Sequence, residues 1–385
     1  MTDLERILPL WSELKAAGVE YVLATIIAVE GSSYRRPGAC MLLAQDGRRA
    51  GTVSGGCLES EVARRAWWLT ASGPAVQRYS TAEDDGERPF GSGCGGVVWL
   101  LLERASTADL LLGAFQQSFE RRASLALATI VEGAQVGRRA FAPAMPEQTD
   151  GVSNNAEDAL QQCAERALAI NTSSDETILL DGTEARVWTD FRRARPGLWI
   201  YGAGDDAKPQ VSLAKELGWY VGLSDSRAQL VTRARFPLAD ELHVLQLSDM
   251  PASPSTEYSP ALNNLRSQDA VVVMSHSFEQ DSRVLASLLA GPMPLAYIGV
   301  LGTQRRTREL LAEAARLLSI AADPITGRLP TAERWLAELH APTGLDLGAD
   351  SPETIALSVV AEIQKCFTKA SALPLREVRA AALVS

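Results

Sequence analysis

The sequence predicts an α/β protein in two parts, a mixed α/β domain followed by a Rossmann-like, doubly wound parallel sheet. The second half alternates short apolar runs with helical patterns, as βαβ units do. The first of those runs is followed by Gly202-Ala203-Gly204-Asp205-Asp206-Ala207, which matches the G-x-G-x-x-A turn between a strand and a helix. The first half instead combines helical patterns with strands and a hairpin signal.

The length of 385 residues, with 46% hydrophobic and 22% charged residues, is ordinary for a globular protein of two domains. The basic, proline-containing stretch 192–197 marks the boundary, so we expect domains 1–192 and 193–385, with a loop or insertion over about 140–192. The net charge of −10 argues against binding to nucleic acid or to an anionic membrane surface. No apolar run reaches the roughly 18 residues of a membrane span, and the acidic start 1–5 is unlike a secretory signal. We therefore expect a cytoplasmic protein.

The first half opens with apolar residues at helical spacing, which predicts a helix over residues 3–17 that ends at Gly18. Asp46-Gly47 is a strong hairpin signal, and strands are expected on both sides of it. The expected strands are residues 21–29, 39–44, 51–54, 75–80, 97–103 and 125–131, with two weak ones near 177–180 and 185–189. The expected helices after the first run from Cys57 to about residue 70, over 108–121 and over about 156–169.

The second half contains five short, continuous apolar runs of the kind found in buried parallel strands. These are residues 198–201, 219–223, 241–245, 270–274 and 296–300. Residues 247–265, rich in serine and proline, predict a long irregular loop. The last predicted helix begins at Ser351-Pro352-Glu353, because serine is a favourable N-cap and proline a favourable first helical residue.

Gly55-Gly56-Cys57 is the most informative stretch of the chain. Two glycines allow the backbone to adopt positive φ or to approach a ligand closely. Cys57 stands at the expected start of a helix, where exposed N–H groups and the helix dipole favour a thiolate. The turn therefore predicts a reactive sulfur beside amides that can bind an anion. The alternative, a small apolar side chain in the core, stays open because free cysteine is commonly buried.

A second thiol has nearly the same setting, since Cys94 is followed by Gly95 and Gly96 and then by an apolar strand. Two cysteines in glycine turns indicate sulfur chemistry or the capture of an anionic cofactor. The remaining cysteines lie in apolar or helical patterns and are interpreted as structural: Cys40, Cys163 and Cys366. No pair has CxxC spacing and the chain has 3 histidines, which argues against a structural zinc site.

The glycine fingerprint of the second half is strong for a Rossmann-like fold and weak for a bound dinucleotide. Asp225 ends the strand after Gly202 and Gly204, where a ribose-binding acid is expected. However, Asp205 and Asp206 stand where a pyrophosphate would meet the helix N-terminus, and two carboxylates there would repel it. The sequence therefore argues against NAD(P) as a cofactor.

Two further turns fall at the expected C-terminal edge of the parallel sheet, where ligands of open α/β sheets bind. His276 follows one strand, and Gly299 and Gly302 precede a helix start that carries Arg305 within a pair of arginines. An arginine there can bind phosphate. Ordinary structural roles remain open, for His276 as a cap or core histidine and for Arg305 as a solvated helix charge.

The order of these landmarks resembles the XdhC/CoxI family, the accessory proteins of xanthine dehydrogenase and related molybdenum hydroxylases. The resemblance covers nearly the whole chain except about 140–195 and 247–265. The matching stretches of the first half are Gly31-Ser32-Ser33-Tyr34-Arg35-Arg36-Pro37-Gly38-Ala39, Gly51-Thr52-Val53-Ser54-Gly55-Gly56-Cys57-Leu58-Glu59 and Cys94-Gly95-Gly96. Those of the second half are Gly202-Ala203-Gly204, Phe236-Pro237-Leu238-Ala239-Asp240, Ser275-His276, Gly299-Val300-Leu301-Gly302, Gly344-Leu345-Asp346-Leu347-Gly348-Ala349 and Pro352-Glu353.

The resemblance implies an N-terminal XdhC/CoxI domain, a C-terminal Rossmann-like domain and a homodimer. It implies a molybdenum cofactor chaperone that binds molybdopterin, either as such or as a dinucleotide, and is an accessory protein rather than an enzyme. Such a protein assists sulfuration of the cofactor with a cysteine desulfurase and delivers it to an apo molybdenum hydroxylase. The family commonly has His-Val after the second glycine, where this chain has Asp205-Asp206, which argues against a nucleotide role for this turn.

The expected cofactor contacts are the residues of these turns. They are Gly55, Gly56, Cys57, Glu59, Cys94 and Gly95 in the first half and Gly202, Gly204, His276, Gly299, Gly302 and Arg305 in the second. Cys57 is the expected molybdenum ligand or sulfur-transfer group, because a soft thiolate suits a molybdenum–sulfur centre. Glu59 can either bond pterin nitrogens or complement the helix dipole.

Two other functions remain open. The first is an NAD(P)-dependent oxidoreductase that uses the Rossmann-like half, with His276 as its acid–base group. The second is a purely structural partner protein whose glycine turns only shape an interface.

Overall fold

The computed structural model describes residues 3–56, 58–80, 96–144, 155–250, 262, 264–291, 294–321 and 330–382. The chain forms two compact units, residues 1–195 and 196–385, called here the first and the second unit. The predicted fold class, a mixed α/β part followed by a Rossmann-like parallel sheet, is confirmed. No helix of the described segments combines the length and the apolar character needed to cross a bilayer.

The first unit contains a five-stranded antiparallel sheet in the order β3-β2-β1-β5-β4. Its elements are α1 (Asp3–Ala17), β1 (Tyr21–Glu30), β2 (Cys40–Ala44), β3 (Arg49–Gly51), α2 (Glu59–Leu69), β4 (Ala75–Ser80), β5 (Val97–Arg104) and α3 (Ala105–Arg121). Tyr21 and Leu23 of β1 pack in one core with α1 and α3, whereas Val22 and Ala24 pack in another with α2. Because helices cover both faces, β1 is apolar along most of its length instead of alternating.

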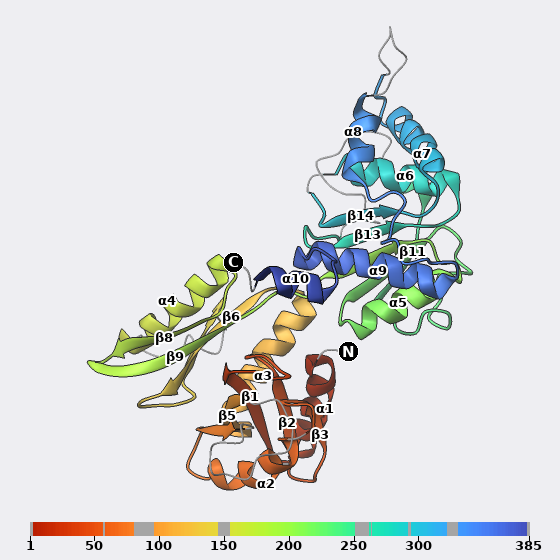
Figure 1. Cartoon of the computed structure of the whole chain (residues 1–385). Helices are drawn as coiled ribbons and strands as arrows, with labels where there is room; N and C mark the ends of the chain where they lie inside the picture. The colour runs from red at the N-terminus through yellow and green to blue at the C-terminus, as the bar shows by residue number, and fades with distance from the viewer. Residues whose placement is uncertain are drawn as a thin grey trace. The chain divides into compact units, whose positions relative to one another are not determined.

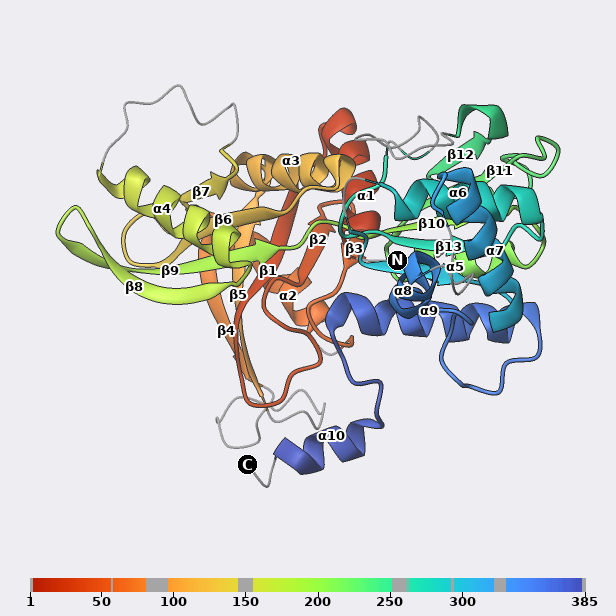
Figure 2. The same ribbon diagram turned by 90° about the horizontal axis from the view of Figure 1, so that it is seen from above.

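A second sheet of the first unit has four antiparallel strands in the order β7-β6-β9-β8. Its elements are β6 (Leu125–Glu132), β7 (Arg139–Ala142), α4 (Asn155–Ile170), β8 (Ser174–Leu180) and β9 (Thr183–Arg192). Figure 2 shows α4 lying along this sheet, and Leu160 and Cys163 of α4 are buried against it. The sequence predicted most of these strands but treated them as one layer with the preceding ones, and it missed β7.

The second unit is a five-stranded, wholly parallel sheet in the order β12-β11-β10-β13-β14. Its strands are β10 (Gly197–Tyr201), β11 (Tyr220–Asp225), β12 (Glu241–Val244), β13 (Ala270–Val273) and β14 (Tyr297–Val300). Its helices are α5 (Ala207–Glu216), the short 3-10 helix η2 (Leu247–Asp249), α6 (Phe278–Leu289), α7 (Gln304–Leu317), α8 (Pro330–Glu338), α9 (Pro352–Thr368) and α10 (Leu375–Ala382).

Helices cover both faces of this parallel sheet (Figure 1). One core joins α6, α7 and α8 to the sheet through Tyr201 and Val273, and the other joins α5 and α9 to it through Ile200 and Val272. Neighbouring residues of one strand thus enter opposite cores, which is the pattern of a doubly wound sheet.

Two details of the predicted elements differ from the structure, and a third lies largely outside the described residues. The predicted strand 51–54 is wrong, because from Thr52 onward the chain bends into hydrogen bonds with Glu59. The predicted start of a helix at Ser351 is confirmed as a capping box, but α10 follows that helix and was not predicted. Most of the predicted loop 247–265 lies outside the described residues.

Candidate functional site

Glu59 ties the Gly55–Gly56 turn of the first unit to the start of α2. Its buried carboxylate accepts hydrogen bonds from the hydroxyls of Thr52 and Ser54 and from the Ser54 amide, the last at 2.8 Å. Burial alone would raise the pKa of this carboxyl, but the hydrogen bonds from Ser54 and Thr52 outweigh it and lower the pKa to about 2. Glu59 is therefore charged at neutral pH, and the structure gives it the role of holding the turn.

Ser54 holds the next part of the same turn. Its hydroxyl oxygen accepts hydrogen bonds from the amide of Gly56 at 3.2 Å and from that of Leu58, the residue directly before α2, at 3.0 Å. Gly56 has a φ of +119° and open space where a Cβ would stand, so the turn presents bare backbone at this point. The sequence signal for this role was a serine shortly before the start of a helix. Ser54 was instead expected in the strand 51–54.

Two of the glycine turns meet at one end of the five-stranded sheet. Antiparallel pairing sets Glu30, the last residue of β1, opposite Val97, the first residue of β5. The turn that follows β1 therefore adjoins Gly96, the described residue directly before β5. A Cβ on Gly96 would collide with the backbone carbonyl oxygen of Ser32, so this close approach requires glycine.

Tyr34 connects the remaining glycine turn to this end of the sheet. Its ring carbons lie 3.7 Å from the position that a Cβ of Gly55 would occupy, and its side chain is 73% exposed. Tyr34 was not among the expected site residues, although a large aromatic residue among glycines and serines was a usable signal. The predicted contacts Cys57, Cys94 and Gly95 lie outside the described residues.

In the second unit, the strand order places the topological switch between β10 and β13. The loops that follow these two strands, residues 202–206 and 275–277, are called here the switch-point loops. Gly202 lies against the other loop, because it has a φ of +141° and its Cβ would stand 2.6 Å from the Met274 carbonyl and 2.8 Å from the Ser275 Cα. Only glycine fits there.

A side-chain contact also joins the switch-point loops. His276 Nε2 lies 2.9 Å from Asp206 Oδ2, although the histidine is 68% exposed and has a φ of +62°. The other carboxylate oxygen of Asp206 stands where a Cβ of Gly204 would be. Asp205 forms ion pairs with Lys208 at 2.7 Å and Arg235 at 3.0 Å. The turn that holds pyrophosphate in dinucleotide enzymes is thus lined by this chain's own carboxylates.

Asp225, at the end of β11, is fully buried and engaged by its neighbours. Its Oδ1 accepts from the amide and the Nε of Arg227, both at 2.9 Å, and its Oδ2 accepts from the Ala203 amide at 2.8 Å and from Arg227 at 2.7 Å. Burial would raise the pKa of this carboxyl, but the Arg227 and Ala203 hydrogen bonds hold it below its usual range. A ribose would have to displace these donors.

The remaining predicted contacts of the second unit differ in their accessibility. Gly299 is packed tightly, since a Cβ there would stand 2.5 Å from Thr343 Oγ1 and 2.6 Å from Tyr297 Cε1. A Cβ on Gly302 would instead have one neighbour within 4 Å, Cδ of Arg306 at 3.5 Å. Arg305 is 88% exposed and lies 3.9 Å from Glu309, so it faces solvent and has only a loose ion pair.

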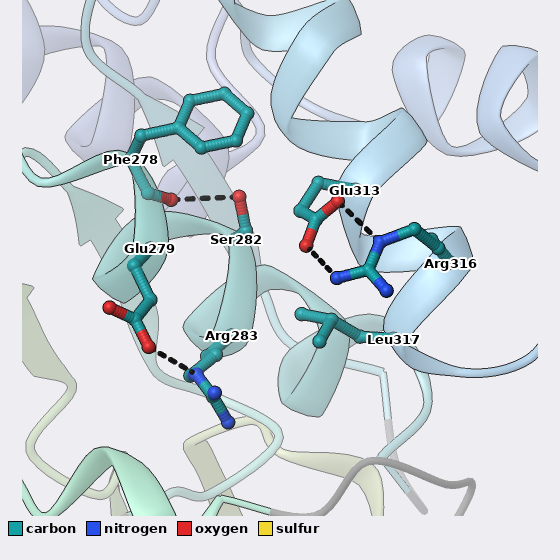
Figure 3. Close-up of a pocket in the computed structure, with 7 residues that line it drawn as sticks. All are labelled: Phe278, Glu279, Ser282, Arg283, Glu313, Arg316 and Leu317. Carbon is teal, nitrogen blue, oxygen red and sulfur yellow. Dashed lines mark hydrogen bonds and ion pairs between the residues drawn. The ribbon is translucent and has the colours of Figure 1, made fainter.

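A hollow of about 200 Å³ lies between α6 and α7 and contains none of the predicted contacts (Figure 3). Its charged residues are paired with each other, Glu279 with Arg283 at 3.2 Å and Glu313 with Arg316 at 2.5 Å. It therefore offers no uncompensated charge to a ligand. The described residues also contain no cluster of three histidine, cysteine or carboxylate side chains that could hold a metal ion.

Comparison with known proteins gives consistent matches over both units. The model of the XdhC and CoxI family matches residues 14–80, and that of the XdhC Rossmann domain matches residues 198–363. A probable xanthine dehydrogenase subunit of Bacillus subtilis (strain 168) is 30% identical over 353 residues, which cover 89% of this chain and 92% of that protein. The molybdenum cofactor insertion chaperone PaoD of Escherichia coli (strain K12) is 25% identical over 374 residues, or 94% of this chain and 89% of that protein.

A solved structure shows the same arrangement of elements. The crystal structure of a xanthine dehydrogenase from Bacillus halodurans superposes with a TM-score of 0.71 at 29% sequence identity, and the match covers 96% of each chain.

Proposed function

The chain belongs to the XdhC and CoxI family, and from that premise we propose that it captures the molybdenum cofactor and inserts it into an apo molybdenum hydroxylase of the xanthine dehydrogenase type. The observation that carries this proposal is the meeting of glycine turns around Tyr34 and Gly55 in the first unit. The protein acts as an accessory factor and not as an enzyme.

The described residues of the first unit fit the chemistry of this cofactor. A pterin is a flat ring system, and the exposed ring of Tyr34 offers a stacking surface for it beside the bare backbone of Gly55 and Gly56. Cys57 follows these glycines directly and supplies a soft sulfur ligand for molybdenum or for sulfur transfer. The cofactor would contribute the dithiolene-bound metal whose terminal ligand is exchanged for sulfide. Cys94 and Gly95 are proposed to contact it as well.

Further details of this function are the source of the sulfur, the form of the cofactor and the oligomeric state of the protein. We propose that the protein works with a cysteine desulfurase during sulfuration of the cofactor, that it forms a homodimer and that it resides in the cytoplasm. The cofactor is molybdopterin or its dinucleotide form. In the second unit, the exposed His276 and Arg305 are proposed to contact its phosphate or nucleotide part. Gly202, Gly204, Gly299 and Gly302 shape the loops around them.

An NAD(P)-dependent oxidoreductase is not supported by the switch-point loops. Asp225 is occupied by Arg227 and Ala203, so it has no free oxygen to offer a ribose. Asp205 and Asp206 place carboxylates, paired within the chain, where a pyrophosphate would bind.

Delivery of the cofactor is tested by reconstitution of a client enzyme. Chain loaded with molybdenum cofactor is mixed with an apo molybdenum hydroxylase, and the hydroxylase activity is followed over time. We expect activation by the wild-type chain and a large loss with Cys57→Ala, because the proposed sulfur ligand is absent. Cys163→Ala removes a buried thiol of α4 and should still deliver the cofactor. Equal delivery by Cys57→Ala and the wild type would refute the role of Cys57.

Tyr34→Ala should weaken binding of the cofactor by roughly tenfold or more, because stacking of a planar ring on an aromatic side chain contributes about 1–3 kcal/mol. Tyr34→Phe keeps the ring and should bind like the wild type. Trp68→Ala is the matched control, since Trp68 is also 73% exposed but lies in α2, away from the glycine turns in sequence. The measurement is a titration of pterin fluorescence, and equal affinities of the Tyr34→Ala and Trp68→Ala variants would contradict the stacking role.

A further inference from the structure

Outside these loops, the second unit contains a tightly ordered carboxylate, Glu362 of α9. Its Oε2 accepts from the Tyr297 hydroxyl at 2.6 Å and from the Gly344 amide at 2.7 Å. Its Oε1 lies 3.0 Å from Nδ1 of His340. Burial would raise the pKa of this carboxyl, but the hydrogen bonds from Tyr297, Gly344 and His340 hold it below its usual range. Glu362 is therefore a charged and fixed partner for the imidazole.

His340 is fixed by more than this carboxylate. Its ring stacks on the Tyr297 ring at 4.2 Å between centroids and 24° between planes. Its backbone pairs with β14, since the Val300 amide donates to its carbonyl at 3.0 Å. With Nδ1 facing a carboxylate, the proton of the neutral imidazole is assigned to Nδ1, so Nε2 carries the lone pair. Nε2 can then act as a base.

The atom that faces this base is a sulfur. Cys366 Sγ lies 4.0 Å from His340 Nε2, and the thiol stands four residues after Glu362, which places both side chains on one face of α9. Burial raises the pKa of the Cys366 thiol, the charge of Glu362 raises it further, and Lys365 offsets part of this effect. The thiol is therefore protonated at neutral pH and needs a base in order to react.

We propose that Cys366, His340 and Glu362 form a base-assisted nucleophilic thiol that exchanges with small disulfides. This arrangement has the three parts of an activated nucleophile: a thiol, an imidazole base within reach of it and a carboxylate that orients the base. The proposal is independent of cofactor binding, and it gives Cys366 a chemical role in addition to the structural one expected from the sequence.

The reaction balances without any further reagent. The Cys366 thiol transfers its proton to His340 Nε2, and the thiolate attacks one sulfur of the disulfide. A new S–S bond forms to Cys366 while the original S–S bond breaks. The leaving thiolate takes the proton from the imidazolium, so one molecule of thiol is released. Cys366 is oxidised to a mixed disulfide, and the leaving half of the disulfide is reduced.

Exposure distinguishes Cys366 from the other cysteines that the structure describes. Cys40 and Cys163 are 2% and 4% exposed, whereas Cys366 is partly exposed. The imidazole of His340 is 34% exposed as well, so a small disulfide in solvent can reach both groups. Among the described cysteines, only Cys366 has a histidine as its hydrogen-bond neighbour.

The test uses the full-length chain under native conditions, with oxidised glutathione as the probe. The rate of mixed-disulfide formation at Cys366 is followed by isotope-coded alkylation and peptide mass spectrometry. We expect His340→Gln and Glu362→Gln to slow this rate by about tenfold or more, because they remove the base or its orientation. His243→Gln is the matched control, since His243 also pairs with a carboxylate, that of Glu241 at 2.6 Å, and its loss should leave the rate unchanged.

A loss of structure would change the rate in the opposite direction, because a loosened chain exposes Cys366 and speeds its reaction. The pH profile provides a second readout. The titratable groups around the pair are Glu362 and Lys365 on α9 and Tyr297 on β14. The pH profile of the rate should differ between the wild type and His340→Gln, because only the wild type has the imidazole that accepts the thiol proton. An unchanged or faster rate in His340→Gln, or an unmodified Cys366 in the wild type, would overturn the proposal.

Discussion

Replacing Glu59 by glutamine is expected to lower the free energy of unfolding of the first unit by about 3 kcal/mol at pH 7, because the pKa of this carboxyl falls from its ordinary value of 4.5 to about 2 on folding. The amide of glutamine carries no charge, and its NH₂ group would meet the donors of Ser54 and Thr52. Urea unfolding, followed by hydrogen exchange of peptides from residues 21–80, measures the loss.

The effect of Glu59 depends on pH with a definite sign. Because the pKa is lower in the folded chain than in the unfolded one, the stabilisation is fully present above pH 4.5 and is lost as the pH falls toward 2. The difference between the wild type and Glu59→Gln should therefore shrink over this range. Glu61→Gln is the control on the same helix turn; Glu61 forms ion pairs with the exposed Arg64 and Arg65, so its replacement should cost about 1 kcal/mol or less. Equal losses from both variants would contradict the role of Glu59.

Gly202→Ala is expected to destabilise the second unit by about 3 kcal/mol or more. An alanine there would need a φ of +141°, and its Cβ would stand 2.6 Å from the backbone of Met274. The backbone at the end of a central strand cannot move aside as a flexible side chain can. The strain of the positive φ and the overlap of the Cβ with the Met274 backbone therefore both destabilise the variant. The switch-point loops would be forced apart, and His276 would lose its contact with Asp206.

The control for Gly202 is Gly348→Ala. Gly348 also has a positive φ, +69°, but nothing lies within 4 Å of its Cβ position. That variant should cost only about 1–2 kcal/mol, the penalty of the left-handed conformation itself. The comparison by urea unfolding of the two variants separates backbone strain from overlap. A loss for Gly202→Ala no larger than that for Gly348→Ala would show that the two loops can move apart freely.

The fold was largely predictable because its patterns are local. The alternation of apolar runs and helical spacing identified all five parallel strands, and the G-x-G-x-x-A turn located the first βα unit. The elements that were missed depend on contacts distant in sequence. The strand β7 exists only by pairing with β6, and the bend at Thr52 exists because Glu59 draws the chain away from the sheet.

The site was less predictable, for a physical reason. The residue types show that Glu59 and Asp225 carry a negative charge. They do not show that hydrogen-bond donors of the folded chain already occupy the carboxylate oxygens. Likewise, Cys366 has no special sequence context, and only folding places His340 beside it. By contrast, the glycine turns themselves are visible in the sequence, and Gly96 and Gly202 are positions where the structure allows no other residue.

Capture of the cofactor by the chain alone tests the central claim most directly. Purified full-length chain is mixed with molybdenum cofactor released from a molybdoenzyme and passed through a gel-filtration column, and molybdenum and pterin are measured in the protein fractions. The account predicts that both elute with the chain in equal, stoichiometric amounts and that Tyr34→Ala reduces them together. Protein fractions that contain neither molybdenum nor pterin would contradict it.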